Sequence, residues 1–322
     1  LALAELAERS GAPLAFEAAV GGGVPIVKTL REALAGNRIQ RVSGILNGTC
    51  NYILSKMETE RLPFEVCLAE AQRLGYAEAD PTFDVGGFDT AHKLSILASL
   101  AFGVRIDAGA VSVEGIESIT LADLAAADEL GFRIKLLGVA TRSEHGVEQR
   151  VHPTMVGKAT TLAQTMGVLN AVTVDGDRVG ALTLVGPGAG GDATASAVAA
   201  DLADIARGGC APAFGRPLAA LVESERVSLQ RHEGGYYVRL SVLDRPGSMA
   251  TIARRMADNG ISLESIMQRP KSHNDKADRQ TVILVTHATT EHSVRLAVSA
   301  IETEGYLIGK PQVIRIERPV AA

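Results

Sequence analysis

The sequence predicts a multidomain protein of mixed α/β and α+β class, and three patterns support this prediction. A helix followed by a strand-like run in residues 1–20 is typical of the end of an α/β unit. Residues 132–185 indicate consecutive strands, because they are rich in Val, Leu and Thr and contain turn residues. After residue 236 the expected order is β-α-β-β-α-β, which is the ferredoxin-like order. A chain of 322 residues is long enough for two or three domains.

The composition indicates an ordinary soluble globular protein that binds neither nucleic acid nor a membrane. Hydrophobic residues make up 46% of the chain and charged residues 21%. The formal net charge of −5 predicts no basic surface for nucleic acid, and no apolar run reaches the roughly 18 residues that a membrane span needs. The cysteines Cys50, Cys67 and Cys210 are too scattered for a disulfide frame or a zinc site. A reducing cytoplasm therefore fits best.

In the first third of the chain, helical patterns outnumber strand patterns. The first helix stops at Ser10-Gly11, a pair that commonly ends helices. Apolar residues recur with a period of 3.6 in the later helices. The expected elements are a helix at 1–9, a strand at 14–20, a helix at 24–34, a strand at 41–46, a helix that follows residues 47–49 and continues to 57, and helices at 64–74 and 88–102.

Strands dominate the rest of the chain. Turns are expected at 144–146 and 175–177 within the strand region, and the glycine-rich loop 186–191 opens a helix at 193–207. A linker at 208–231 precedes the last block. That block comprises a strand at 236–243, a turn at 244–247, a helix at 248–260, strands at 263–268 and 280–286, a helix at 291–305 and a strand at 312–317.

Four carboxylates and one ammonium lie close together in residues 75–93: Glu78, Asp80, Asp84, Asp89 and Lys93. Like charges at short range repel, so such a cluster needs a cationic partner, which is Lys93 or the amino group of a substrate. Asp89 and Lys93 are four residues apart and share a helix face. A solvent-exposed ion pair and a polar loop explain these residues equally simply. The apolar remainder of this helix favours a site in which Lys93 transfers a proton.

Three further motifs are candidate binding segments, and the first two of them each allow two interpretations. Residues 47–49 (Asn-Gly-Thr) are either a helix cap or a binding segment for a carboxylate. The loop 186–191 is either a plain connector or a phosphate-binding loop. In residues 17–24, a carboxylate precedes a kinked, glycine-rich backbone, which offers hard oxygen ligands to a cation.

Taken together, these segments resemble the homoserine dehydrogenase family. Enzymes of this family interconvert L-homoserine and L-aspartate 4-semialdehyde with NADP or NAD, in the biosynthesis of threonine, methionine and isoleucine. The final block resembles an ACT domain, and residues 244–247 (Asp-Arg-Pro-Gly) match its ligand-loop signature. Homoserine dehydrogenases of the longer bacterial type carry such a domain at this end. The matching runs are 16–26, 44–53, 74–93 and 188–198, in the family's order and spacing.

The resemblance implies a role for each matching residue. It makes Lys93 the proton donor and acceptor, ordered by Asp89, and predicts an alkaline optimum for homoserine oxidation because Lys93 must be neutral to accept the proton. It implies substrate binding by Glu78, Asp84, Tyr76, Gly48 and Thr49, cofactor binding by Asn47, Gly188 and Gly190, and a sodium site at Glu17, Val20, Gly22 and Val24. At the ACT domain it implies that a regulatory amino acid, threonine, binds at Asp244, Pro246, Gly247 and Asn259.

The resemblance also predicts how the chain is divided. Residues 1–22, with the returning helix 190–207, correspond to the end of a Rossmann nucleotide-binding domain. Residues 23–189 form the mixed-sheet catalytic and dimerisation domain with helices on one face, 208–235 a linker and 236–318 the ACT domain. The Rossmann fingerprint is expected in roughly 100 residues before Leu1. Without them we expect neither tight NADP binding nor turnover, and the preference between NADP and NAD stays open.

Two other functions remain open at this stage. The ACT domain makes possible an amino-acid-sensing regulatory chain without catalysis of its own, and a different amino-acid-linked dehydrogenase could share the same sheet. In each case a homodimer or homotetramer is expected, because ACT domains generally pair through their sheets.

Overall fold

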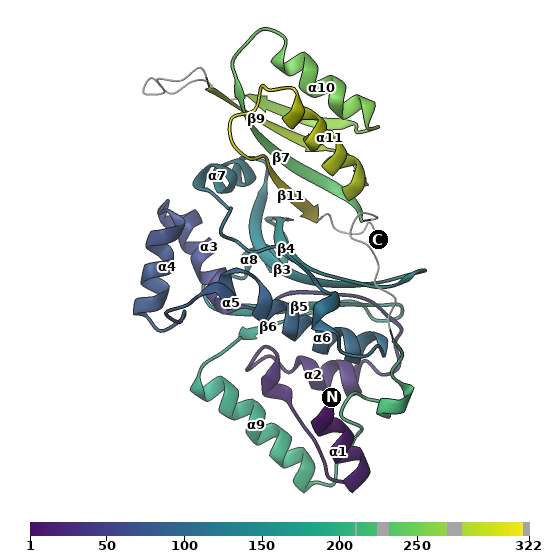
Figure 1. Cartoon of the computed structure of the whole chain (residues 1–322). Coiled ribbons are helices and arrows are strands. Elements are labelled where there is room, and N and C mark those ends of the chain that lie inside the picture. The colour runs from purple at the N-terminus through teal and green to yellow at the C-terminus, as the bar shows by residue number, and fades with distance from the viewer. Residues whose placement is uncertain (210, 224–231, 269–278, 318–322) are drawn as a thin grey trace. The chain divides into compact units, whose positions relative to one another are not determined.

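The computed structural model describes residues 1–209, 211–223, 232–268 and 279–317. Contacts divide the chain into unit 1, residues 1–153 with 158–227, and unit 2, residues 154–157 with 228–322 (Figure 1). The finer boundaries expected at residues 22 and 189 stay a prediction. Cys210 and the part of the expected linker at 224–231 lie outside the described residues.

Unit 1 is built on a mixed sheet with the strand order β6-β5-β1-β3-β4. Strand β1 pairs antiparallel with both β3 and β5, and β5 pairs antiparallel with β6. The short β2 pairs parallel with β4. These strands are β1 (Ile39–Ile45), β2 (Ser112–Val113), β3 (Phe132–Ser143), β4 (Gly146–Gly157), β5 (Leu169–Gly176) and β6 (Gly180–Pro187). The turn expected at 175–177 comes two residues later, because the ladder between β5 and β6 continues to Gly176.

Helices pack on this sheet and carry the acidic cluster. Helix α3 contacts β3 and β5, and α6 contacts β1 and β3. The interior of α6 is buried at Leu94 and Leu97, as its 3.6-residue period predicts. The helices are α3 (Gly48–Glu60), α4 (Phe64–Arg73), α5 (Thr82–Val85), α6 (Phe88–Phe102), α7 (Leu121–Glu129) and α8 (Thr161–Gln164), and a 3₁₀ turn, η3 (Ala108–Ala110), precedes β2.

A buried lysine links α3 to β3. The Lys135 ammonium donates hydrogen bonds to Asn51 Oδ1 at 2.9 Å and to the Thr165 carbonyl at 2.7 Å. Asn51 in turn donates to the carbonyls of Thr165 and Leu169. Burial lowers the pKa of Lys135 to about 8, because desolvation penalises the charged form. This network fixes the segment that leads into β5.

The expected strand at 14–20 is wrong. Residues Glu17–Ala19 form a 3₁₀ turn, η1, instead. The Glu17 carboxylate accepts hydrogen bonds from the amides of Val27 and Lys28, and its own amide donates to Asp201. These distant contacts fold the segment against α2 (Ile26–Lys28) and α9 (Gly191–Ala206), so that it cannot extend into a sheet.

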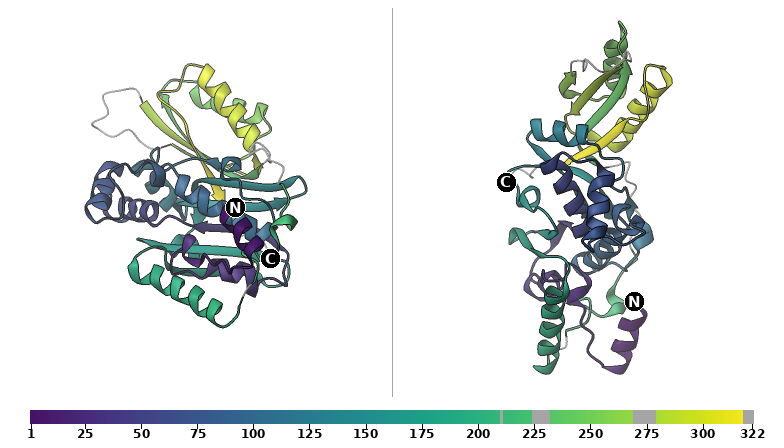
Figure 2. Two further views of the ribbon diagram at one scale, coloured as in Figure 1. Left: turned by 60° about the horizontal axis from the view of Figure 1, so that its bottom comes forward. Right: turned by 90° about the vertical axis from the view of Figure 1, so that its left-hand side faces the viewer.

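The remaining helices of unit 1 agree with the sequence pattern. Helix α1 (Ala2–Ser10) ends at Gly11, whose φ of 68° is left-handed and suits glycine. Helix α2 (Ile26–Lys28) continues as a π-helical turn, η2 (Thr29–Ala33), and α9 is Gly191–Ala206. Helices α1 and α9 lie at the same end of the unit (Figure 2). A last 3₁₀ turn, η4, covers Leu218–Ala220.

Unit 2 has the predicted β-α-β-β-α-β order. Its sheet order is β11-β7-β9-β8, with all neighbours antiparallel. Alternate residues of β7 (Tyr236, Val238, Leu240, Val242) are buried against both helices. The elements are β7 (Glu233–Leu243), α10 (Ser248–Asp258), β8 (Leu263–Gln268), β9 (Arg279–Thr286), a short β10 (Thr289–Thr290), α11 (Glu291–Thr303) and β11 (Gln312–Glu317).

In the described part of the chain, none of the helices has both the length and the apolar character that a bilayer crossing requires.

Candidate functional site

The expected catalytic, substrate-binding and cofactor-binding residues line one cavity of about 500 Å³ in unit 1. This volume is in the range of small-molecule sites. The cavity forms where the start of α3, the loop after α4, helix α6 and the glycine-rich loop before α9 meet. Its lining includes Asn47, Gly48, Thr49, Tyr76, Glu78, Asp84, Asp89, Lys93, Gly188 and Gly190.

Lys93 and Asp89 form an ion pair at the wall of this cavity. Lys93 Nζ lies 2.7 Å from Asp89 Oδ2 and also donates to the Leu46 carbonyl at 3.1 Å. The two side chains are only 24% and 20% exposed. The interpretation as a fully solvated surface pair therefore does not hold, because both groups line the cavity. The hydrogen bonds of Lys93 within the described residues use two of its three ammonium protons.

Asn47 joins the start of α3 to the acidic cluster. Its Oδ1 accepts a hydrogen bond from the Cys50 amide at 2.8 Å. Asn47 is therefore the N-cap of α3, which is one of the two interpretations given for residues 47–49. Its Nδ2 donates to Asp84 Oδ1 at 2.8 Å and to Asp89 Oδ2 at 2.9 Å. One amide thus holds two carboxylates that would otherwise repel each other.

The environment of Asp84 favours its neutral form. Burial raises the pKa of the Asp84 carboxyl, and the charges of Asp89 and Glu78 act in the same direction. The hydrogen bond from Asn47 and the charge of Lys93 oppose this shift. A positive charge in the cavity would reduce the repulsion among these carboxylates and would favour the ionised form of Asp84.

The remaining residues of the loop after α4 differ in their roles. Glu78 is exposed at the cavity, whereas Asp80 is not among the lining residues and instead accepts the Thr82 amide at 3.1 Å, at the start of α5. This hydrogen bonding to Thr82 lowers the pKa of Asp80. Tyr76 accepts a hydrogen bond from the Thr49 hydroxyl through its carbonyl, and its ring lies 5.1 Å from that of Tyr52. The Thr49 hydroxyl proton is therefore already used within the protein.

Glycines let two distant loops meet beside the cavity. Gly22 has a φ of 50°, and a β-carbon there would lie 2.6 Å from the Gly188 carbonyl oxygen. No side chain fits at that distance, so the contact between these loops requires glycine. The loop then passes through Gly190, the N-cap of the 16-residue helix α9. Amide groups at such a helix start attract anions.

The expected cation ligands lie near one another, but Glu17 already has partners. Its two carboxylate oxygens accept the Val27 and Lys28 amides at 2.8 and 2.7 Å. Burial raises the pKa of Glu17. The Val24 carbonyl accepts the Ile26 amide at 2.7 Å. Within the described ranges, no group of three or more His, Cys, Asp or Glu residues could hold a metal ion, so a cation here would depend on backbone oxygens.

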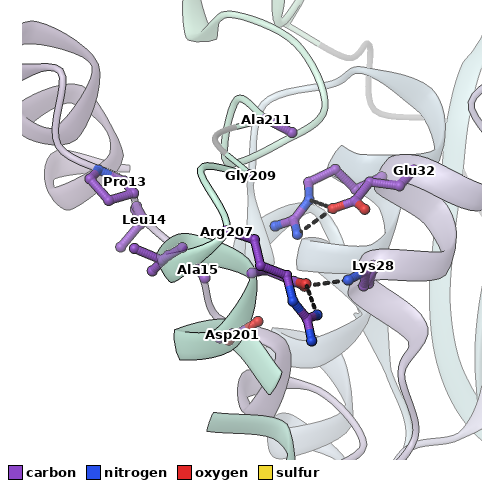
Figure 3. Close-up of a pocket in the computed structure, with 12 residues that line it drawn as sticks. Pro13, Leu14, Ala15, Lys28, Glu32, Asp201, Arg207, Gly209 and Ala211 are labelled. Atoms are coloured by element: carbon purple, nitrogen blue, oxygen red, sulfur yellow. Dashed lines mark hydrogen bonds and ion pairs between the residues drawn. The ribbon is translucent and has the colours of Figure 1, made fainter. Parts of the chain in front are cut away.

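A second cavity of about 380 Å³ lies between α2 and α9. Figure 3 shows its charged lining, which includes Lys28, Glu32, Asp201 and Arg207. Lys28 pairs with Asp204, which also lies 3.7 Å from Arg207. None of the expected catalytic residues lines this cavity, and the Lys28–Asp204 pair connects the two helices.

In unit 2 the expected effector residues lie at opposite ends of α10. Asp244, Pro246 and Gly247 are in the turn before the helix, and Gly247 is its N-cap with a φ of 94°. Asn259 is the C-cap and donates from Nδ2 to the Arg255 carbonyl at 2.8 Å. A helix of this length separates its ends by roughly 15 Å, so one chain does not bring these four residues together.

Comparisons with known proteins match both units. Residues 25–203 match the family profile described as homoserine dehydrogenase, and residues 236–303 match the ACT domain. The chain belongs to the homoserine dehydrogenase family. A regulatory chain without catalytic function is not favoured, because the matched enzyme region makes up more than half of the chain.

Individual homoserine dehydrogenases show how far the similarity extends. That of Pseudomonas aeruginosa is 45% identical over 97% of this chain and 73% of its own length. That of Helicobacter pylori is 41% identical over 95% of this chain and 71% of its own length. The crystal structure of the Thiobacillus denitrificans enzyme has a TM-score of 0.90 and 44% identity over 97% of this chain and 72% of its own. The chain thus spans almost three quarters of these homoserine dehydrogenases.

Sequence reasoning missed the part of the cavity wall near the start of β5, where Val168 and the polar Asn170 lie. Asn170 lies on β5 in line with the buried Val172 and Val174. A polar residue in an apolar alternation was the available signal, but nothing in the sequence shows that this strand reaches the cavity.

We predict that two substitutions of Asn47 differ in stability by an amount that depends on pH. Asn47→Asp and Asn47→Ser both keep an oxygen that caps α3, but the aspartate adds a third carboxylate beside Asp84 and Asp89. Asn47→Asp should therefore lose about 1–3 kcal/mol of stability at pH 7 relative to Asn47→Ser. This difference should shrink as the pH falls, because crowded carboxylates with raised pKa bind protons in the folded state. Urea unfolding at several pH values measures it, and a pH-independent difference would contradict the prediction.

Proposed function

We propose that the cavity of unit 1 binds homoserine beside NADP, or alternatively NAD, and that Lys93 exchanges the proton of the substrate oxygen. The observation that supports this most directly is the position of Lys93 Nζ, 2.7 Å from Asp89 and inside the cavity. The family to which the chain belongs uses NAD(P), and one archaeal homoserine dehydrogenase mutant with a TM-score of 0.55 and 28% identity was solved in complex with NADPH.

The acidic residues suit the amino group of homoserine. Asp84 has a raised pKa and Glu78 stands exposed at the same cavity. An α-ammonium between them would favour the ionised Asp84 and compensate its burial. The substrate hydroxyl would then lie toward Lys93, which Asp89 and the Leu46 carbonyl hold in place.

The glycine-rich loop suits the dinucleotide. Gly188 and Gly190 line the cavity and lead into the amide groups at the start of α9. At Gly190 a β-carbon would meet no other atom within 4 Å, so the backbone there leaves open space for a ligand. When bound, the cofactor accepts the hydride from the carbon that bears the hydroxyl.

The proton step belongs to residues of this chain. As the hydride leaves the substrate carbon, the hydroxyl O–H bond breaks and its proton passes to neutral Lys93, so that the oxygen becomes the carbonyl of the semialdehyde. The same lysine returns the proton in the reverse reaction. Asp89 keeps the amine oriented and stabilises the ammonium that forms.

We predict that Lys93→Ala lowers kcat for homoserine oxidation by about 10²–10⁴-fold, which is the range of general base catalysis. Binding of the cofactor should change little, since Lys93 contacts the substrate oxygen. The measurement is steady-state kinetics of the enzyme that contains this chain. Lys56→Ala is the matched control, because Lys56 pairs with Glu70 at 2.5 Å and does not line the cavity. Equal kcat values for Lys93→Ala and the unchanged enzyme would refute the role.

We further propose a sodium ion at Glu17 and the backbone of Val20, Gly22 and Val24. The support is a buried carboxylate whose pKa is raised, beside a kinked backbone. A cation would offset the cost of keeping that carboxylate ionised.

Binding of sodium should stabilise the fold. We predict a higher unfolding temperature in sodium chloride than in choline chloride of equal ionic strength. Glu17→Gln should abolish the difference, while Glu32→Gln, an exposed residue paired with Arg31, should keep it. Equal unfolding temperatures of the unchanged protein in both salts would exclude the site.

For unit 2 we propose that threonine binds at the turn 244–247, in a homodimer or homotetramer located in the cytoplasm. The separation of Asn259 from this turn within one chain supports an arrangement in which two ACT domains contribute to one site. The free, buried Cys50 and Cys67 agree with a reducing compartment.

Calorimetry with threonine and with homoserine tests the assignment of the two ligands. We predict heat of binding for both, and loss of the threonine heat alone in Asp244→Ala. Loss of the homoserine heat alone is expected in Asp84→Ala, which serves as the reciprocal control. Homoserine binding without any threonine binding would remove the effector from this proposal.

A further inference from the structure

Asn170 is a buried polar residue at the wall of the cavity. It is 1% exposed and lies near the start of β5, where Val172 and Val174 follow it on the same face of the strand. Both valines are fully buried, so the alternation along β5 predicts an apolar side chain at position 170. Asn170 nevertheless lines the same cavity as Lys93 and Gly188.

The surroundings leave space for this amide and give its oxygen no partner. A β-carbon at Gly188 would lie 2.1–2.3 Å from Asn170 Cγ, Oδ1 and Nδ2, so the flat amide rests directly against the glycine backbone. Among the residues that the structure describes, Asn170 Oδ1 has no hydrogen-bond partner. The loop before α9 therefore leaves room for the Asn170 amide but provides no hydrogen-bond donor for its oxygen.

An unpaired buried carbonyl lowers stability, and an apolar residue of similar shape would avoid this cost. Packing therefore does not explain an asparagine here. A hydrogen-bond donor supplied by a ligand does explain it, because filling the cavity then satisfies the oxygen.

We propose that Asn170 Oδ1 accepts a hydrogen bond from the carboxamide N–H of the nicotinamide ring. This inference rests on the proposed dinucleotide site, because Gly188 belongs to the loop that would hold the cofactor. The substrate ammonium is a poorer candidate, since the carboxylates of Asp84, Asp89 and Glu78 offer it charged acceptors. A neutral amide oxygen matches a neutral amide donor, and the pairing fixes which face of the ring meets the substrate. Asn170 is thus a specificity residue for the pyridine substituent.

The test compares NADP⁺ with its 3-acetylpyridine analogue, in which a methyl group replaces the carboxamide NH₂. Equilibrium binding is measured by calorimetry on the enzyme that contains this chain. The unchanged enzyme should bind NADP⁺ about tenfold more tightly than the analogue, as one hydrogen bond allows. Asn170→Leu should bind both ligands equally. Its unfolding temperature without ligand should equal or exceed that of the unchanged enzyme.

Two further variants keep the result interpretable. Asn170→Ala removes the same acceptor with less steric change and should also lose the discrimination, so a folding failure of the leucine variant leaves the test intact. Ser99→Ala removes another fully buried oxygen without a partner among the described residues, and it lies outside the cavity. It should keep the tenfold preference.

The outcomes separate this inference from the proposed function. If the unchanged enzyme binds no NADP⁺, the cofactor site itself is wrong. If it discriminates and both Asn170 variants still discriminate equally well, the oxygen holds only an internal water and the inference is overturned. If Ser99→Ala also loses the discrimination between the two ligands, the cause is general destabilisation, and the inference is again overturned.

Discussion

The contacts of the Asn47 amide are the constraint on which the cavity depends. One side-chain oxygen begins α3, and the nitrogen of the same group holds carboxylates from α5 and α6. The position of a helix and the spacing of two charges are therefore set by one residue. Because Asp89 in turn holds Lys93, the position of the Lys93 amine depends on a cap at the start of a different helix. The geometry of the charged cluster and the start of α3 are therefore coupled through Asn47.

Short-range patterns were sufficient for much of the fold. The spacing of Asp89 and Lys93 places them together on α6, and the alternation in β7 predicts which side chains fill the core of unit 2. The segment at 14–20 was predicted wrongly because its conformation depends on Glu17 binding amides at 27 and 28. Its local sequence is compatible with a strand. The contacts that prevent a strand involve residues too far away in the sequence for an argument from local propensity to include them.

The candidate site shows the same limit. The glycine-rich loop and the acidic loop are recognisable by composition, but their meeting is not. Asn170 lies beside Gly188 only because β5 and β6 pair in the register that sets Asn170 opposite Gly186. That register depends on the whole ladder, and a one-residue slip would turn Asn170 to the other face. The sequence alone therefore identifies the charged half of the cavity more readily than the neutral half.

The buried Lys135 ties folding to proton release. Its pKa of about 8 in the folded chain is below the value of about 10.4 that a solvated lysine has. Between these two values the unfolded chain carries more protons at this position, so the free energy of unfolding rises with pH across that interval. Below it, the folded chain keeps the full cost of an enclosed charge. Oxidation of the substrate liberates a proton as well, so mildly basic conditions favour this part of the scaffold and the reaction that it supports.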